Sequence, residues 1–372
     1  MKSLRGQTIV FVTSGAGRKL GRVERRWLPV IEALVSQGVT VLVICALHAP
    51  FEDAARAAGA TIAPYRLDKL NLVRTRSRLR KYLARYRPAI VHSTGHAADA
   101  VVLWAAEELP VKVVVSTSCT SLPAEKPRGI GSWARRRVGR ASLSRLDALL
   151  VDCRDLVDAA VNAGVPRDIV ALDPPSVRIR HVTEAARQVS VALPQGPPCF
   201  GYAGTLERTK GLHLLAAAAP LVREQHPEAR AVIAGQGHAG VLVAAAARDG
   251  RIDLLGHVES VPAVLGALDV CVFPVTAPGT PTTLLEAAAL GRPIVAAAVT
   301  GVAEMFADGR EIVLVPPHDV RALADAVIGL LGDPDRARVL GEAARHTVID
   351  RYSAAAAVER HLDLYRRLSA ST

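Results

Sequence analysis

The sequence has no apolar run long enough to cross a membrane. Its longest uncharged apolar stretch, Val39–Leu47, is about half as long as a membrane-spanning helix requires. The apolar run near the N-terminus is also too short for the core of a secretory signal peptide. These absences exclude an integral membrane protein and predict a cytoplasmic one.

Cysteines are few and widely separated. The chain contains five, and the closest pair, Cys119 and Cys153, lies 34 positions apart. This spacing excludes a CxxC metal site and a dense disulfide framework. Cys45 and Cys271 lie inside apolar runs, so we interpret them as core residues rather than as nucleophiles.

Acidic residues are scarce in the first half of the chain. Residues 1–178 contain 28 Lys and Arg against 15 Asp and Glu, whereas the remainder contains 18 against 20. The densest basic block, Arg74–Arg87, has seven basic residues and no acidic one. No zinc-finger, helix-turn-helix or mixed aromatic and basic signature accompanies it, so nucleic acid is not the expected partner.

Two explanations of the basic block remain open. It can be the solvated face of a helix. Alternatively, it can attract an anionic surface or acceptor, such as a phosphorylated substrate or lipid at the inner face of a membrane.

Short β-branched runs alternate with helical patterns along most of the chain. This order predicts an α/β protein in which helices cover both faces of parallel sheets. In the first half the expected strands are Thr8–Thr13, Val39–Leu47, Ala89–His92, Val111–Thr117 and Ala148–Val151, and a helix is expected over Asn71–Arg87. In the second half they are Phe200–Ala203, Ala231–Ala234, Val270–Phe273, Ile294–Ala297 and Ile312–Val315.

The alternation is interrupted once, before a Pro/Gly cluster that is typical of a linker. We therefore expect a first Rossmann-like domain over residues 1–178, a linker over 179–198 and a second Rossmann-like domain over 199–350. A helix over 351–372 is expected to pack back on the first domain. Ligands would bind in a cleft at the carboxyl ends of the strands.

A glycine loop, Ser14–Gly21, follows the first expected strand and resembles a dinucleotide-binding turn only superficially. An NAD enzyme would place an acidic residue at the end of its second strand, but here that strand continues into Ala46–Pro50. We therefore disfavour a dehydrogenase. Small residues at a helix start can still bring backbone amides close to a phosphate or a sugar.

The second half contains a more specific arrangement. The first strand leads to Arg208 and Lys210, which places cations at the carboxyl edge of the sheet. Further on, Thr282 or Thr283 can cap a short helix whose amides form an anion site. Glu286, one turn into that helix, is well placed to accept hydrogen bonds from ribose or sugar hydroxyls.

With these residues in hand, the chain resembles a family-4-type glycosyltransferase (glycosyl transferases group 1) of the GT-B fold over nearly its whole length. The similarity is most specific in the segments TKGLHLLAAAAPLV, VIAGQG, LLGHVESVPAVLGALDVCVFP and LLEAAALGRPIVAAAVTGVAE. In the first half, the segment that begins Gly21-Arg22 resembles the glycine loop of the family, and Ile90–Ser93 resembles its fourth strand.

The resemblance implies a hexosyltransferase-type enzyme that transfers a sugar from a nucleotide diphosphate donor with retention of configuration and without a metal ion. It implies no cofactor, because the nucleotide sugar is a substrate. The acceptor would be a glycan, a lipid-linked molecule or a small molecule. By position, Lys210 would bind the diphosphate and Glu286 the ribose. The other residues implied to face the donor are Gly21, Arg22, Arg208, His257, Val258, Thr280, Thr282, Thr283 and Leu284.

The sequence departs from the family at two positions that normally carry charge. Thr205 replaces an arginine that precedes the Lys-Gly element, and Pro278 replaces an acid that addresses the donor sugar. Two alternatives to the transferase therefore stay open. One is a catalytically degenerate GT-B protein that binds nucleotide or glycan as a partner subunit, and the other is a nucleotide-sugar epimerase.

Overall fold

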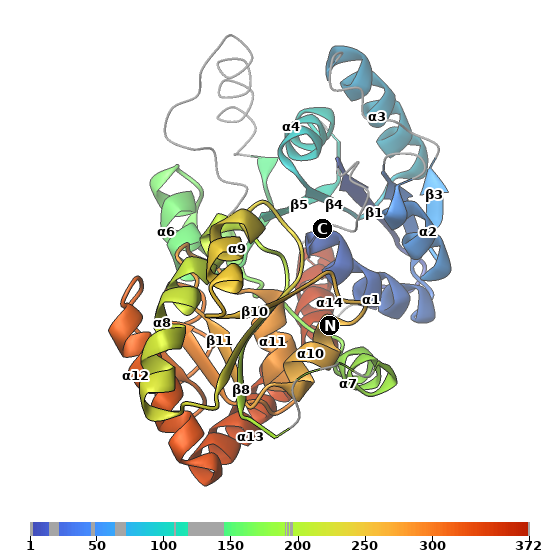
Figure 1. The fold of residues 1–372 in the computed structure, drawn as a ribbon. Coiled ribbons are helices and arrows are strands. Elements are labelled where there is room, and N and C mark those ends of the chain that lie inside the picture. Colours follow the sequence, from blue (N-terminus) through green and yellow to red (C-terminus); the bar gives the residue numbers. More distant parts are fainter. Residues whose placement is uncertain are drawn as a thin grey trace. The chain divides into compact units, whose positions relative to one another are not determined.

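The computed structural model describes residues 3–14, 22–45, 49–63, 72–107, 109–117, 145–189, 191, 193 and 196–370. Contacts divide the chain into two compact units (Figure 1). Unit 1 consists of Met1–Pro174 together with Ala355–Thr372, and unit 2 consists of Pro175–Ala354.

Unit 1 contains a seven-stranded sheet whose described pairings are all parallel, in the order β3-β2-β1-β4-β5-β6-β7. Its strands are β1 (Thr8–Thr13), β2 (Thr40–Ile44), β3 (Thr61–Ala63), β4 (Ile90–Thr94), β5 (Lys112–Thr117), β6 (Ala148–Val151) and β7 (Val170–Leu172). Its helices are α1 (Arg22–Ser36), α2 (Pro50–Ala57), α3 (Leu72–Tyr86), α4 (His96–Ala105), α6 (Arg154–Asn162), the 3-10 helix η2 (Arg167–Ile169) and α14 (Ala354–Ala370).

Alternating residues of β1 belong to two separate cores, one on each face of this sheet. Val10 and Val12 pack with the buried residues of α3, α4 and α6. Phe11 packs with those of α1, α2 and α14. Because a central parallel strand is buried on both faces, β1 reads as a continuous apolar run. Figure 1 shows the C-terminal helix α14 beside α1, although the two are far apart in sequence.

Unit 2 contains a six-stranded sheet, also parallel in its described pairings, in the order β10-β9-β8-β11-β12-β13. Its strands are β8 (Cys199–Ala203), β9 (Arg230–Ala234), β10 (Asp253–Gly256), β11 (Val270–Phe273), β12 (Ile294–Ala297) and β13 (Val313–Val315). Its helices are α7 (Ile179–Gln188), the 3-10 helix η3 (Arg208–Lys210), α8 (Leu212–Gln225), α9 (Gly240–Arg248), α10 (Val261–Ala267), α11 (Thr282–Ala289), α12 (Val320–Gly332) and α13 (Pro334–Arg351).

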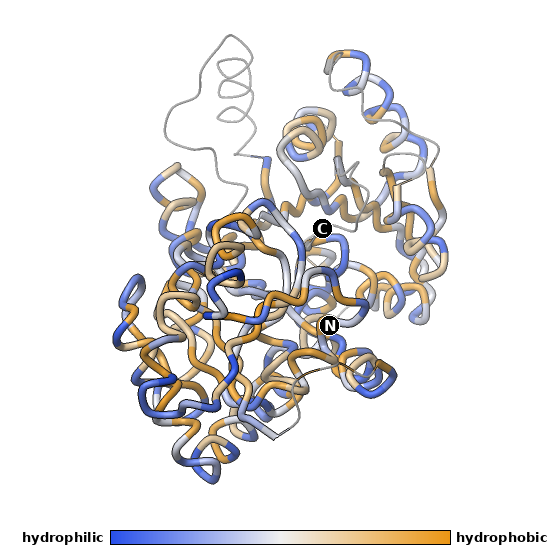
Figure 2. Tube along the Cα trace, in the orientation of Figure 1, coloured by the Kyte–Doolittle hydropathy of each residue, from blue (hydrophilic) through white to orange (hydrophobic). Residues whose placement is uncertain are grey.

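The strands are largely apolar in both units, and the helices also carry apolar residues along part of their length (Figure 2). The expected α/β architecture of two doubly wound parallel sheets is confirmed. The first part of the expected linker, however, is helix α7, whose Val182 is buried in the core of unit 2. Within the described part of the chain, no helix has both the length and the hydrophobicity needed to span a membrane.

Candidate functional site

The strand order of unit 2 reverses direction at β8. The chain proceeds from β8 outward to β9 and β10, and then returns to β11 on the other side of β8. In open parallel sheets, ligands bind outside the carboxyl ends of the strands at such a reversal. The loops after β8 and β11 therefore flank the candidate site.

Glycines allow these loops to approach each other closely. Gly211, at the start of α8, has a φ of +65°, and a Cβ there would lie 1.8 Å from the carbonyl oxygen of Pro274, which follows β11. A Cβ on Gly204, which follows β8, would lie 2.7 Å from the Tyr202 hydroxyl and 3.2 Å from Cγ2 of Thr283. Any larger residue would push the two loops apart.

Tyr202 links the loop after β8 to the start of α11. Its buried hydroxyl donates a hydrogen bond to the carbonyl of Thr205 at 3.0 Å and is also hydrogen-bonded to the Thr283 side chain. Burial raises the pKa of Tyr202, and the negative charges of Glu207 and Glu286 raise it further. The Tyr202 phenol therefore stays neutral, and Glu286 lies close enough to raise its pKa.

The structure places Lys210 and Glu286 on the two elements that flank the reversal. Lys210 is the last residue of η3, and Glu286 lies in the middle of α11; both are half-buried. Arg208, in the same turn as Lys210, is exposed. A cation and a carboxylate are thus held beside the carboxyl ends of β8 and β11.

The start of α11 differs from the expected capping. Thr282 and Thr283 are the first two helical residues, and Pro281 takes the capping position without a side-chain hydrogen bond. The side chains of Thr282 and Thr283 are half-buried, so the start of α11 offers its backbone amides to a ligand.

Two neighbours of these threonines have structural side chains. The Thr280 hydroxyl donates to the carbonyl of Gly301 at 2.7 Å, and the Leu284 side chain is buried in the core. Thr280 and Leu284 can therefore face a ligand only through their backbone.

His257 and Val258 follow β10, which is separated from β8 by β9. His257 is exposed, whereas Val258 is half-buried and packs on the core of unit 2. The amide of Gly235, after β9, donates to the carbonyl of Gly256 at 2.7 Å and joins these two strand ends. The pair thus lies at the same edge of the sheet as Lys210, toward its β10 side.

Of the two remaining predicted residues, Gly21 lies outside the described residues. Arg22 is the first residue of α1, but its side chain also lies outside the description.

Unit 1 has its own reversal, between β1 and β4, and the sequence analysis did not identify the polar residues there. A Cβ on Gly95, which has a φ of +96°, would lie 2.5 Å from the Ser14 hydroxyl. The Ser93 hydroxyl donates to the Asp99 carboxylate at 2.7 Å. Burial raises the pKa of Asp99 to about 7, although hydrogen bonds from Ser93 and Gly95 oppose the shift. The segment GHAAD (residues 95–99), which follows the expected strand Ala89–His92, was the sequence signal that could have identified these polar residues.

His92 in β4 is structural. Its ring is fully buried, and its nitrogens lie 2.6 Å from the Tyr365 hydroxyl and 2.7 Å from the Ser116 hydroxyl. Burial lowers the pKa of His92 well below its usual range, helped by His361 and Arg26. The imidazole is therefore neutral, with both nitrogens engaged.

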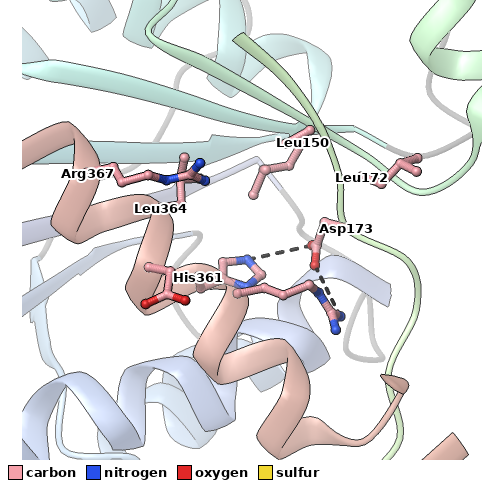
Figure 3. Close-up of a pocket in the computed structure, with 9 residues that line it drawn as sticks. Leu150, Leu172, Asp173, His361, Leu364 and Arg367 are labelled. Carbon is pink, nitrogen blue, oxygen red and sulfur yellow. Dashed lines mark ion pairs between the residues drawn. The ribbon is translucent and has the colours of Figure 1, made fainter. Parts of the chain in front are cut away.

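A cavity of about 480 Å³ lies between α14 and the β6–β7 edge of unit 1 (Figure 3). At its base, the buried Asp173 carboxylate lies 3.2 Å from Nη1 of Arg26, 3.6 Å from Nε2 of His361 and 3.8 Å from Nη2 of Arg360. Burial alone would raise the pKa of Asp173, but His361, Arg26 and Arg360 beside the carboxylate lower it. We interpret this cluster as an anchor for α14.

The expected core cysteines are confirmed. Cys45 and Cys271 are buried, and burial raises the pKa of each thiol to about 12. A thiol with such a pKa is not a nucleophile at neutral pH. Among the residues that the structure describes, no three His, Cys, Asp or Glu side chains gather in a way that would hold a metal ion.

Two family models match the chain. The model described as Glycosyl transferase 4-like domain covers residues 21–175, and the model described as Glycosyl transferases group 1 covers residues 197–333. The chain is also similar to alpha-maltose-1-phosphate synthase from Mycolicibacterium smegmatis, with 31% identity over 310 residues. That match covers 74% of this chain and 73% of that protein.

Glycogen synthase from Mycobacterium tuberculosis is 35% identical over 175 residues, which cover 45% of this chain and only 42% of the synthase. Among solved structures, Anabaena HepE in complex with UDP superposes with a TM-score of 0.79 at 16% identity, covering 97% of this chain and all of that one. A complex of the same protein with UDP-glucose gives a TM-score of 0.77 at 17% identity, with 97% and 100% coverage. With both sheets doubly wound and both halves matched, this chain belongs to the family-4-type, group 1 glycosyltransferases and has their GT-B fold.

Proposed function

We propose that this glycosyltransferase moves a hexose from a nucleotide diphosphate donor to a glycan, lipid-linked or small-molecule acceptor, with retention of configuration. Its similarity to the maltose-1-phosphate and glycogen synthases supports sugar transfer. The HepE complex with UDP-glucose supports a nucleotide sugar as donor. The observation that carries the proposal is the position of Lys210 in η3 and Glu286 in α11, the two elements that flank the reversal at β8.

In this proposal, Lys210 binds the donor diphosphate and Arg208 adds positive charge to the same turn. The backbone from Thr280 to Leu284, chiefly the amides of Thr282 and Thr283, holds a phosphate at the positive end of α11. Glu286 accepts hydrogen bonds from the ribose hydroxyls, and the stretch His257-Val258 lines the base.

The reaction breaks the bond between the anomeric carbon and a diphosphate oxygen, so negative charge grows on the departing nucleotide. Lys210 and the N-terminus of α11 stabilise that charge because it increases in the transition state. Such stabilisation needs no metal ion. Transfer is therefore expected to continue in EDTA, and activity that requires added Mn²⁺ or Mg²⁺ would contradict this assignment.

The test is binding and turnover of UDP-, GDP-, ADP- and TDP-sugars by the wild type and by Lys210→Ala and Glu286→Ala. A hydrogen bond to a charged group contributes about 1.5–3 kcal/mol, so each variant should bind the donor roughly 10- to 100-fold more weakly. Arg310→Gln, at an exposed arginine outside the site, is the control. Unchanged donor affinity in both site variants would overturn the assignment.

A degenerate, non-catalytic protein is the second candidate, because neither Thr205 nor Pro278 carries a charge toward the donor. In the structure, Thr205 is exposed and its carbonyl accepts the hydrogen bond from Tyr202. Such a protein would bind nucleotide sugar through Lys210 and Glu286 but would neither hydrolyse nor transfer it. Single-turnover assays with a mixed acceptor pool separate the two functions.

A further inference from the structure

A small cavity in unit 2 is lined by three arginines from different elements. It has a volume of about 320 Å³ and opens between α7, α10, α11 and α13. Its arginines are Arg187 in α7, Arg292 just after α11 and Arg345 in α13. The cavity lies away from the candidate donor site: Lys210 and Glu286 are not among the described residues that line it.

The helices around this cavity are held together independently of any ligand. The Ser260 hydroxyl caps α10 by accepting from the amide of Ala263 at 3.2 Å, and it donates to the carbonyl of Ala185 in α7 at 2.9 Å. On the other side, a Cβ on Gly341 in α13 would lie only 2.3 Å from the carbonyl oxygen of Gly291. These contacts fix the backbones that carry the arginines.

Small residues keep the cavity open. Gly266 in α10 lines it together with Ala186 and Ala289. A Cβ on Gly266 would reach 3.7 Å from the Cβ of Ala186 and would occupy part of the space. The volume corresponds to that of about ten water molecules, which is enough for a phosphate group and several more heavy atoms.

The positive charge around the cavity is poorly compensated by the protein. No acidic side chain is among the described residues that line it, and Glu342 lies 3.6 Å from Nη1 of Arg345 at its margin. The buried Nε of Arg292 has no hydrogen-bond partner within the described part of the chain. Three guanidinium groups around one cavity repel each other, and a bound anion would relieve that repulsion.

Capping of α11 does not explain Arg292. The carbonyls of Glu286, Ala287 and Ala288 at the end of α11 already accept hydrogen bonds from the backbone amides of Leu290, Gly291 and Arg292. The Arg292 side chain is therefore not needed to complete the helix. An anion bound in the cavity would give its guanidinium group a direct charged partner.

We propose that this cavity binds the phosphate group of a small phosphorylated molecule through Arg187, Arg292 and Arg345. A guanidinium group presents its donors in a planar fork that matches phosphate oxygens. The site lies at the C-terminal end of α11, whereas the proposed donor site lies at its N-terminal end. Eight helical residues separate the two ends by about 12 Å, so both sites can be filled at once.

The test is isothermal titration of the full chain with inorganic phosphate, at constant ionic strength against chloride. The Lys210→Ala variant is titrated in parallel to remove the contribution of the donor site. Phosphate binding should persist in Lys210→Ala and should weaken tenfold or more in Arg187→Gln and in Arg292→Gln. Arg338→Gln, which changes an exposed arginine of the same helix as Arg345, should bind like the wild type.

A fifth variant is expected to change phosphate affinity in the opposite direction. Glu342→Gln removes the carboxylate beside Arg345 and should strengthen phosphate binding several-fold. Arg187 is exposed, so Arg187→Gln keeps the test decisive if Arg292→Gln does not fold. Absence of phosphate binding in Lys210→Ala, or equal affinity in Arg187→Gln and Arg338→Gln, would overturn the proposal.

Discussion

The hydroxyl of Tyr365 in α14 lies 2.6 Å from Nδ1 of His92 in β4, although 273 positions separate the two residues. The other ring nitrogen of His92 lies 2.7 Å from the Ser116 hydroxyl in β5. Both rings are fully buried. This hydrogen-bonded chain fastens the C-terminal helix to the centre of the unit 1 sheet.

Tyr365→Phe should therefore destabilise unit 1. The substitution keeps the ring but leaves a buried nitrogen of His92 without its partner, at a cost of about 1–3 kcal/mol in the free energy of unfolding. All three tryptophans of the chain, at positions 27, 104 and 133, belong to unit 1, so their fluorescence in urea monitors this unit. Tyr86→Phe, at a tyrosine that is 40% exposed, should cost less than about 0.5 kcal/mol. Equal losses in the two variants would contradict the structural importance of the pair.

Asp99 should make unit 1 less stable as the pH rises. Its pKa is about 7 in the folded protein and near 3.8 when unfolded, so between these values the folded state keeps a proton that the unfolded state has lost. Stability falls with rising pH in that window. Asn in place of Asp99 still accepts from Ser93 but does not titrate. The stability of Asp99→Asn relative to the wild type should rise by on the order of 2 kcal/mol from pH 5 to pH 8. Tryptophan fluorescence in urea at both pH values measures the difference, and a constant difference would refute the prediction.

Gly211→Ala should be far more damaging than Gly250→Ala. Both glycines have a left-handed backbone conformation, with φ of +65° and +69°, so alanine at either position incurs about 1 kcal/mol of backbone strain. At Gly250 a Cβ meets no atom within 4 Å, whereas at Gly211 it would collide with the carbonyl oxygen of Pro274. We expect an additional loss of at least about 2 kcal/mol in Gly211→Ala. Donor affinity should fall as well, because Lys210 is adjacent. Circular dichroism during urea unfolding and donor titration measure both effects, and similar results for the two variants would exclude this packing argument.

The basic helix α3, much of which is hydrophilic in Figure 2, contains arginines of two kinds. Arg76 stacks on Trp104 at 4.6 Å and donates to its carbonyl, and Arg80 donates to the carbonyl of Glu107 at 3.0 Å. These two stabilise unit 1. The exposed basic residues Arg74, Arg78, Lys81 and Arg85 follow one another at helical spacing and form a stripe.

If this stripe contacts anionic lipid, the triple variant Arg78→Gln/Lys81→Gln/Arg85→Gln should bind anionic vesicles more weakly by about 1 kcal/mol per residue. The effect should shrink with added salt. A variant with the same loss of charge in unit 2, at the exposed Arg248, Arg321 and Arg338, is the matched control. Equal co-sedimentation of both variants with anionic vesicles would favour the alternative of a solvated helix face.

The central strands were predictable from the sequence, and three edge strands were not. The run Thr8–Thr13 is continuously apolar because β1 is buried on both faces, and its predicted limits match the structure. By contrast, β3, β7 and β10 have only three or four residues, lie at sheet edges and are partly exposed. Strands this short and exposed give a weak hydrophobic pattern, although the three-residue edge strand β13 was predicted, within Ile312–Val315.

The sequence predicts Lys210 and Glu286 as the cation and carboxylate of the candidate donor site because both lie in segments with distinctive neighbours, and this assignment stays a prediction. The contacts that hold the elements around the site together were not predictable from the sequence. Tyr202 is linked to Thr283 across 81 positions, and Asp173 reaches Arg26 across 147 positions. Such partners are brought together only by the order of strands in each sheet, which a single sequence does not specify.

Unit 1 is built from both ends of the described chain, and this has a consequence for synthesis on the ribosome. Leu362 and Tyr365 of α14 complete the core that contains Phe11 and Trp27. Unit 2 is translated in full before these residues exist, so it can fold first, contrary to the usual N-to-C order of domain folding. The nascent unit 1 must meanwhile keep uncovered the part of one apolar sheet face that α14 later covers. A chaperone that shields this face during translation would protect the protein at its most aggregation-prone stage.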